Sequence, residues 1–174
     1  MFFFIGISNN ISINSTTSAQ DIIPYLINKL NLYFKDIAYI HNIQKSEKEI
    51  KFRASPFRFI WNGWNLFNPI YQGKFRINGI GSLITINYTV IFLEYFIYSL
   101  LFSILALTPM FPTNTLRFLY LFLIWALYIF HIFWTRFRIN KFLRKITMRV
   151  IFEYLRMNNF NSIEKFKAKN LFLK

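Results

Sequence analysis

One carboxylate and one imidazole of this 174-residue chain lie inside long apolar runs, where an ionisable side chain is costly. Glu94 belongs to the run 90–107, and His131 belongs to the run 118–134. If the chain folds back through the Pro-containing segment 108–115, the two side chains reach a similar depth. A carboxylate beside an imidazole can sense or relay protons, although a structural hydrogen bond between helices, or a carboxylate reaching the surface, is the commoner arrangement. Glu94 and His131 are therefore the candidate intramembrane polar pair.

Other catalytic patterns are missing from the sequence. There is no Cys, and the second histidine, His41, lies in a different region from His131, so neither thiolate chemistry nor a zinc site based on His spacing is available. Glu47 and Glu49 alternate beside a Lys-rich turn, a pattern more typical of a solvated turn than of an acid/base dyad. Glycine-rich phosphate loops and nucleophile elbows are also absent. We expect no catalytic, cofactor-binding or metal-binding residues, and we interpret the protein as a non-enzyme.

An aromatic segment before the apolar runs could form a binding surface. Phe57, Phe59, Trp61 and Trp64 surround a glycine bend in the sequence. The same rings could instead fill the core of a small domain or rest at the membrane interface, where Trp is enriched. The four residues are a candidate aromatic binding surface, and no particular small-molecule ligand follows from them.

The chain carries a net charge of +14, and its C-terminal region, residues 136–174, is strongly basic. Apolar residues recur there at helical spacing, with Lys and Arg largely on another face. Such a helix beside a membrane exit is expected to lie on anionic headgroups. Packing against the protein's own sheet is an alternative, and nucleic acid is a less favoured partner because the bilayer is already adjacent. The candidate lipid contacts are Arg136, Arg138, Lys141, Arg144, Lys145 and Arg149.

The apolar runs themselves predict a transmembrane helical hairpin, with spans at about 90–107 and 118–134. Hydrophobic residues make up 55% of the chain, more than a small soluble domain can bury. Each run covers roughly 26 Å as a helix, near the lower limit for crossing a hydrocarbon core. Basic residues crowd beyond the second run and are absent from 108–116. This bias predicts cytoplasmic termini, in a bacterial plasma (inner) membrane.

The N-terminal region, residues 1–89, predicts a small α+β domain with one helix and about five or six mostly antiparallel strands. A helical stripe follows Asp21, the favoured N-cap. We expect a first strand at 2–8 and a loop at 8–18. Alternating residues later in the domain predict a half-buried sheet, and 78–81 predicts a hairpin turn.

Together these patterns predict three segments: the domain 1–89, the hairpin 90–135 and the basic amphipathic tail 136–174. The expected function is that of a non-enzymatic accessory, scaffold or interaction subunit docked on the membrane. Its partners would be anionic lipid and a membrane protein or further copies of the chain. The alternative is an oligomeric membrane sensor or transporter component that uses Glu94 and His131.

Overall fold

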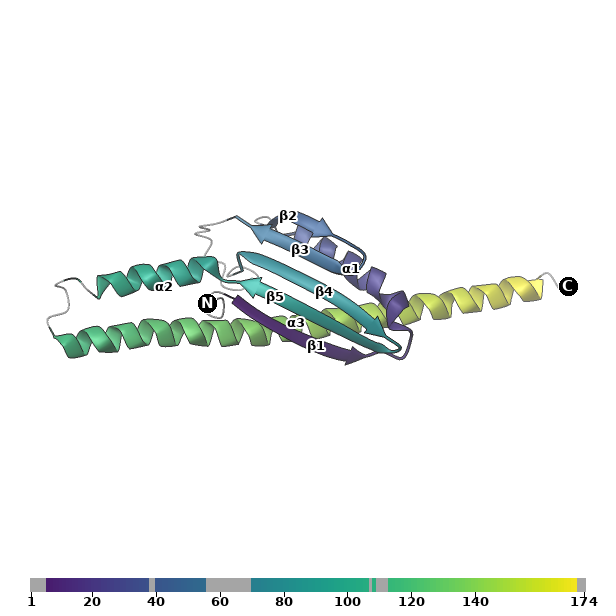
Figure 1. The fold of residues 1–174 in the computed structure, drawn as a ribbon. Helices are drawn as coiled ribbons and strands as arrows, with labels where there is room; N and C mark the ends of the chain where they lie inside the picture. The colour runs from purple at the N-terminus through teal and green to yellow at the C-terminus, as the bar shows by residue number, and fades with distance from the viewer. Residues whose placement is uncertain (1–5, 38–39, 56–69, 107, 109–112, 172–174) are drawn as a thin grey trace.

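The computed structural model of the chain describes the backbone of residues 6–37, 40–55, 70–106, 108 and 113–171, and the side chains of those residues up to 158. The described part is an α+β fold with one antiparallel sheet and helices against it (Figure 1). Its elements are β1 (Gly6–Asn14), α1 (Ala19–Lys35), β2 (Ile40–Lys45), β3 (Glu49–Ala54), β4 (Gln72–Ile80), β5 (Leu83–Ile91), α2 (Leu93–Leu105) and α3 (Asn114–Leu171).

The five strands are in the order β1-β5-β4-β3-β2, and every pairing is antiparallel, which confirms the predicted sheet type. α1 and α3 cover one face of the sheet, and no described helix or strand covers the other, which we call the open face (Figure 1). On β5 the residues Ile84, Ile86, Tyr88 and Val90 are buried against these helices, as their alternation predicts. The sheet is therefore half-buried, with most of its polar residues on the open face.

The first strand differs from the prediction. β1 runs over Gly6–Asn14, so a segment that the sequence predicted to be a loop is a regular strand paired with β5 along its whole length. Ile7 and Ile11 are buried, whereas Ser8, Asn10 and Ser12 are exposed on the open face. The exposed polar residues alternate with inward-facing residues, which is the pattern of a half-buried strand and not of a loop. Residues 1–5 of the predicted strand lie outside the described residues.

α1 begins earlier than predicted. Ala19 is its first residue, Ser18 occupies the N-cap position without a side-chain cap, and Pro24 lies inside the helix. Asp21 is therefore not the N-cap. The backbone N–H of Ala19 donates to the carbonyl of Gly81 at 2.8 Å, so the β4–β5 turn supplies the acceptor that a capping side chain would provide. The predicted apolar stripe of α1 is buried, with Ile22, Leu26, Leu30 and Phe34 at its centre.

The β4–β5 hairpin is present, but its turn is Gly81-Ser82 rather than the predicted segment 78–81. Gly81 has a φ of 58°, the conformation that glycine adopts cheaply at the first position of a type II′ turn. Gly79 is instead needed for close packing: a Cβ there would lie 2.7 Å from the Cβ of Ala19. Contact with α1, which is remote in sequence, therefore determines where the small residue is required.

The first predicted span, 90–107, begins too early. Val90 and Ile91 belong to β5, and α2 has only 13 residues, with Phe92 between strand and helix. A helix of that length covers about 20 Å, less than the hydrocarbon thickness of roughly 30 Å. A transmembrane hairpin of two helices is therefore not established by the structure.

α3 contains the second predicted span and the predicted tail in one continuous helix of 58 residues. Gly and Pro are absent from it, which agrees with the prediction of unbroken helix to about Met157. Among the described residues it is the one helix long and apolar enough to cross a membrane, and only 6% of its most apolar window is buried. A core helix of a soluble protein would be mostly buried there.

The apolar stripe of the tail packs inside the protein. Ile139, Leu143, Ile146 and Val150 are at most 9% exposed, within the same core as α1 and the sheet. The expectation that this stripe rests on lipid is wrong, and the alternative of packing against the protein's own sheet is the one found. α1 covers mainly β2, β3 and β4, so α3 buries the apolar face that remains near β1.

Candidate functional site

A cluster of four polar side chains joins α3 to the sheet directly after the apolar half of the helix. Arg136 donates through Nη2 to Oδ1 of Asn9 on β1 at 3.0 Å. Oδ1 of Asn140 accepts from the Tyr88 hydroxyl at 2.7 Å and from Nδ2 of Asn9 at 3.2 Å. Tyr88 is 1% exposed, and burial raises the pKa of its phenol, which keeps the donor protonated. We call Asn9, Tyr88, Arg136 and Asn140 the junction cluster.

A second set of contacts joins α3 to α1. Lys29 on α1 forms an ion pair with Glu153 at 3.2 Å, and Arg149 pairs with the same carboxylate at 2.8 Å within α3. The pKa of Glu153 is lowered by hydrogen bonds from Arg149 and then from Lys29. The rings of Tyr33 and Phe142 pack 4.7 Å apart between the two helices. α3 is thus held from two sides, by α1 and by the sheet.

The candidate pair Glu94 and His131 is not joined directly. No hydrogen bond or ion pair links them within the described part of the chain. Glu94 is 5% exposed and lies in the first turn of α2, where the helix dipole favours an acidic side chain. The ring of His131 stacks on Tyr95 at 4.3 Å, and its buried Nε2 has no hydrogen-bond partner among the described residues.

A groove of about 450 Å³ lies between α2 and α3 beside His131. Its lining is mostly apolar and aromatic, and the hydroxyl of Ser99 is already bonded to the Tyr95 carbonyl at 2.9 Å. The residues that line it are Tyr95, Tyr98, Ser99, Phe102, Ile124, Leu127, Tyr128, Phe130 and His131. The imidazole is a polar group that this groove could present to a ligand, beside the tyrosines that line it.

The candidate aromatic surface formed by Phe57, Phe59, Trp61 and Trp64 lies outside the described residues. Its role remains a prediction from the sequence.

The six basic candidates lie along α3 after the apolar segment. Five of them are exposed and Arg138 is half-buried. Arg136 bonds with Asn9 and Arg149 with Glu153, and Arg138 also interacts within the protein. Lys141, Arg144 and Lys145 are exposed on the same stretch of the helix.

A cationic cluster lies on the open face of the sheet, where cross-strand register gathers residues that the sequence separates. Glu49 on β3 contacts Lys51 at 3.0 Å, Lys74 at 3.3 Å and Arg76 at 3.4 Å. Its hydrogen bonds, first with Lys51 and then with Lys74, hold the pKa of the carboxyl below its ordinary value. Glu47 lies in the β2–β3 turn instead, so the two carboxylates form no dyad.

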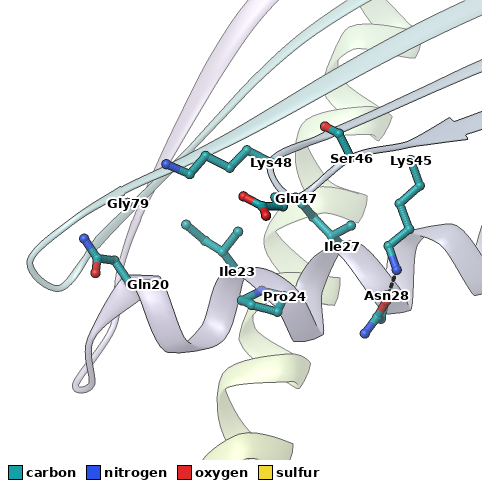
Figure 2. Close-up of a pocket in the computed structure, with 10 residues that line it drawn as sticks. All are labelled: Gln20, Ile23, Pro24, Ile27, Asn28, Lys45, Ser46, Glu47, Lys48 and Gly79. Carbon is teal, nitrogen blue, oxygen red and sulfur yellow. Dashed lines mark hydrogen bonds between the residues drawn. The ribbon is translucent and has the colours of Figure 1, made fainter.

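Glu47 reaches over a different feature, an open groove of about 840 Å³ between α1 and the β2–β3 turn (Figure 2). Ile23, Pro24 and Ile27 form its apolar floor, while Lys45 and Lys48 extend across it and Lys45 donates to Asn28 (Figure 2). The charged side chains are exposed and of both signs. The groove therefore favours no particular class of ligand. In the part of the chain that the structure describes, no group of three or more His, Asp or Glu side chains could hold a metal ion.

Comparison with known proteins assigns no family. No protein family model matches the sequence, and no curated protein matches it significantly. Among solved structures, the di-domain ARO/CYC BexL from the BE-7585A biosynthetic pathway matches 51% of this chain and 37% of its own, with 7% identity and a TM-score of 0.28. The chain thus spans little more than a third of that protein, and a similarity of this size does not establish a shared fold.

The junction cluster predicts strong coupling between Tyr88 and Asn140. Asn140→Ala leaves the buried Tyr88 hydroxyl without its acceptor and should lower the free energy of unfolding by about 1–3 kcal/mol. Tyr88→Phe removes that penalty, so a double-mutant cycle measured by denaturant unfolding in detergent should give a coupling above about 0.5 kcal/mol. Asn87→Ala, on the exposed side of the same strand, is the control. Additive effects of the two substitutions would contradict the cluster.

Proposed function

We propose that the chain is an integral membrane protein whose sheet domain is presented at the cytoplasmic face as a non-enzymatic accessory, scaffold or interaction subunit. The observation that carries this proposal is the apolar surface of α3 over 118–134. Phe118, Leu119 and Phe122 are 73%, 63% and 72% exposed. Moving a large apolar side chain out of water is worth about 1.5–3 kcal/mol, so a surface of this kind requires lipid or a partner.

The finer proposal is a two-pass hairpin in which α2 also enters the bilayer. α2 lies beside the first half of α3, and both project from the same end of the sheet (Figure 1). Aromatic contacts join the two helices, with the rings of Phe96 and Trp125 6.2 Å apart. Leu101, Phe102 and Ile104 of α2 are more than half exposed. A short span can be accommodated by local thinning of the bilayer at modest cost.

The proposed orientation follows from the basic residues after 134. Arg136 and Arg138 directly follow the apolar segment, and the positive-inside bias places them, with both termini, in the cytoplasm of a bacterial cell. Because α3 continues as one helix beyond the apolar segment, its later basic residues lie progressively farther from the lipid headgroups. Arg149 lies 15 positions beyond Trp134, roughly 22 Å along the axis, which exceeds the Debye length of about 8 Å. We therefore propose Arg136 and Arg138 as the headgroup contacts.

Reporter fusions test this topology. Alkaline phosphatase inserted after Thr113 should be active, and the same enzyme fused after Lys174 should be inactive, because phosphatase folds only outside the cytoplasm. A cytoplasmic reporter at the same two sites is the control and should give the opposite pattern. Phosphatase activity at Lys174 but not after Thr113 would reverse the orientation, and equal behaviour at both sites would contradict a two-pass hairpin.

A sensor or transporter component is the second candidate, supported by the unpartnered Nε2 of His131 beside the groove between α2 and α3. In that case His131→Gln should abolish a pH-dependent change of Tyr95 or Trp125 fluorescence in vesicles, while Ser99→Ala, in the same groove, leaves it intact. If wild-type vesicles show no pH-dependent change between neutral and mildly acidic pH, the candidate fails.

A further inference from the structure

The free edge of β1 is an unprotected template for another strand. β1 has nine residues and pairs with β5 over its whole length, from Gly6 opposite Ile91 to Asn14 opposite Leu83. Its other edge has no partner strand in the described part of the chain. The strand contains no charged residue, no proline and no bulge. Edge strands of this kind pair readily with other chains, and most proteins protect them.

The opposite edge of the same sheet carries that protection. β2 has six residues, its register with β3 shifts between His41 and Gln44, and Asn42 has a φ of 51°. Lys45 adds a charge at its end. Short length, an irregular backbone and lysine are the usual means of blocking edge pairing. The fold therefore protects one edge and leaves β1 open.

The flank of α3 beside β1 is apolar and exposed. Asn140 marks the side of α3 that meets β1. Arg144, Phe137 and Met148 lie about 40–80° from Asn140 around the helix axis, on the side away from the core residue Leu143. Phe137 is 60% exposed and Met148 is 44% exposed. This flank faces away from α1, which packs on the opposite side through Phe142.

We propose that the β1 edge and this flank of α3 form one docking groove for an extended segment of a partner protein. The segment would add a sixth strand through backbone hydrogen bonds to β1. On the side of the sheet that the helices cover, its alternate side chains would meet Phe137 and Met148, so apolar residues suit those positions. Arg144 lies between them in sequence and favours an acidic residue in the same row.

A second copy of this chain is not the occupant. Antiparallel pairing of two β1 edges about a two-fold axis reverses the strand direction between the copies. α2 and the first half of α3 project from one end of the sheet, so the two copies would point these helices in opposite directions (Figure 1). Both could not enter the same bilayer. This step rests on the proposed membrane anchoring.

Site-specific photo-crosslinking in the host cell tests the groove. A benzophenone amino acid replaces Asn10 on β1 or, as the control, Asn78 on β4, since both are exposed asparagines on the open face and differ in their distance from the edge. We expect one discrete adduct from Asn10, a much weaker one from Asn78, and a single extended peptide of the partner when the adduct is sequenced. Met148→Asp should lower the adduct yield severalfold, whereas Leu32→Asp, at an exposed apolar residue of α1, should not.

The proposal is overturned by no adduct at Asn10, by equal adducts at the two positions, by an adduct of twice the subunit mass, or by yields that Met148→Asp does not change. Circular dichroism of both aspartate variants excludes unfolding as the reason for a lost adduct. Alkaline extraction of membranes from the same cells reports separately on the membrane anchor. A chain released into the soluble fraction would contradict the proposed function while leaving the edge test readable.

Discussion

The burial of one stripe of α3 against β1 and α1 is the interaction on which the rest of the structure depends. α3 runs through two environments without a break: its segment 118–134 contains no Asp, Glu, Lys or Arg, and the part after it is apolar on the side that meets the core. α1 alone covers only part of the apolar face of the sheet. The rest is covered by α3 through Ile139, Leu143 and Val150. A helix without Gly or Pro has no hinge at the transition, so the sheet domain and the apolar segment move as one body.

The junction cluster lies at that transition and explains why polar residues occur there. Tyr88 is on the strand that leads directly into α2, and Asn140 is on α3, so one hydrogen bond links the two chain segments that enter and leave the apolar region. A displacement of α3 relative to α2 would have to break this bond or move the sheet. The same packing leaves β1 at the edge of the sheet with an exposed flank of α3 beside it, and this supplies the proposed contact surface of an interaction subunit.

The sequence predicted elements whose patterns are local, and it failed where a distant contact decides. The inward row of β5 and the stripe of α1 follow from alternation and helical spacing alone. The predicted first strand ended too early, because Ser8 and Asn10 suggest a loop, and only the period-two recurrence of Ile7 and Ile11 could have revealed how far β1 extends. The stripe of α3 was identified correctly, but amphipathicity does not say whether the facing apolar surface is lipid or protein. Glu94 was expected at the depth of His131, and the ring that stacks on His131 is that of its neighbour Tyr95.

Spin-label accessibility along α3 in bilayers containing anionic lipid tests the division of this helix between lipid and core most directly. The chain has no cysteine, so single cysteines can be introduced at Leu127, Leu143 and Phe152 without background. We expect the label at Leu127 to collide with oxygen from the lipid phase, the label at Leu143 to be immobile, and the label at Phe152 to collide with a water-soluble nickel reagent. A label at Phe152 that is shielded from nickel and exposed to oxygen would place the C-terminal half of α3 on the bilayer and contradict its packing against the sheet.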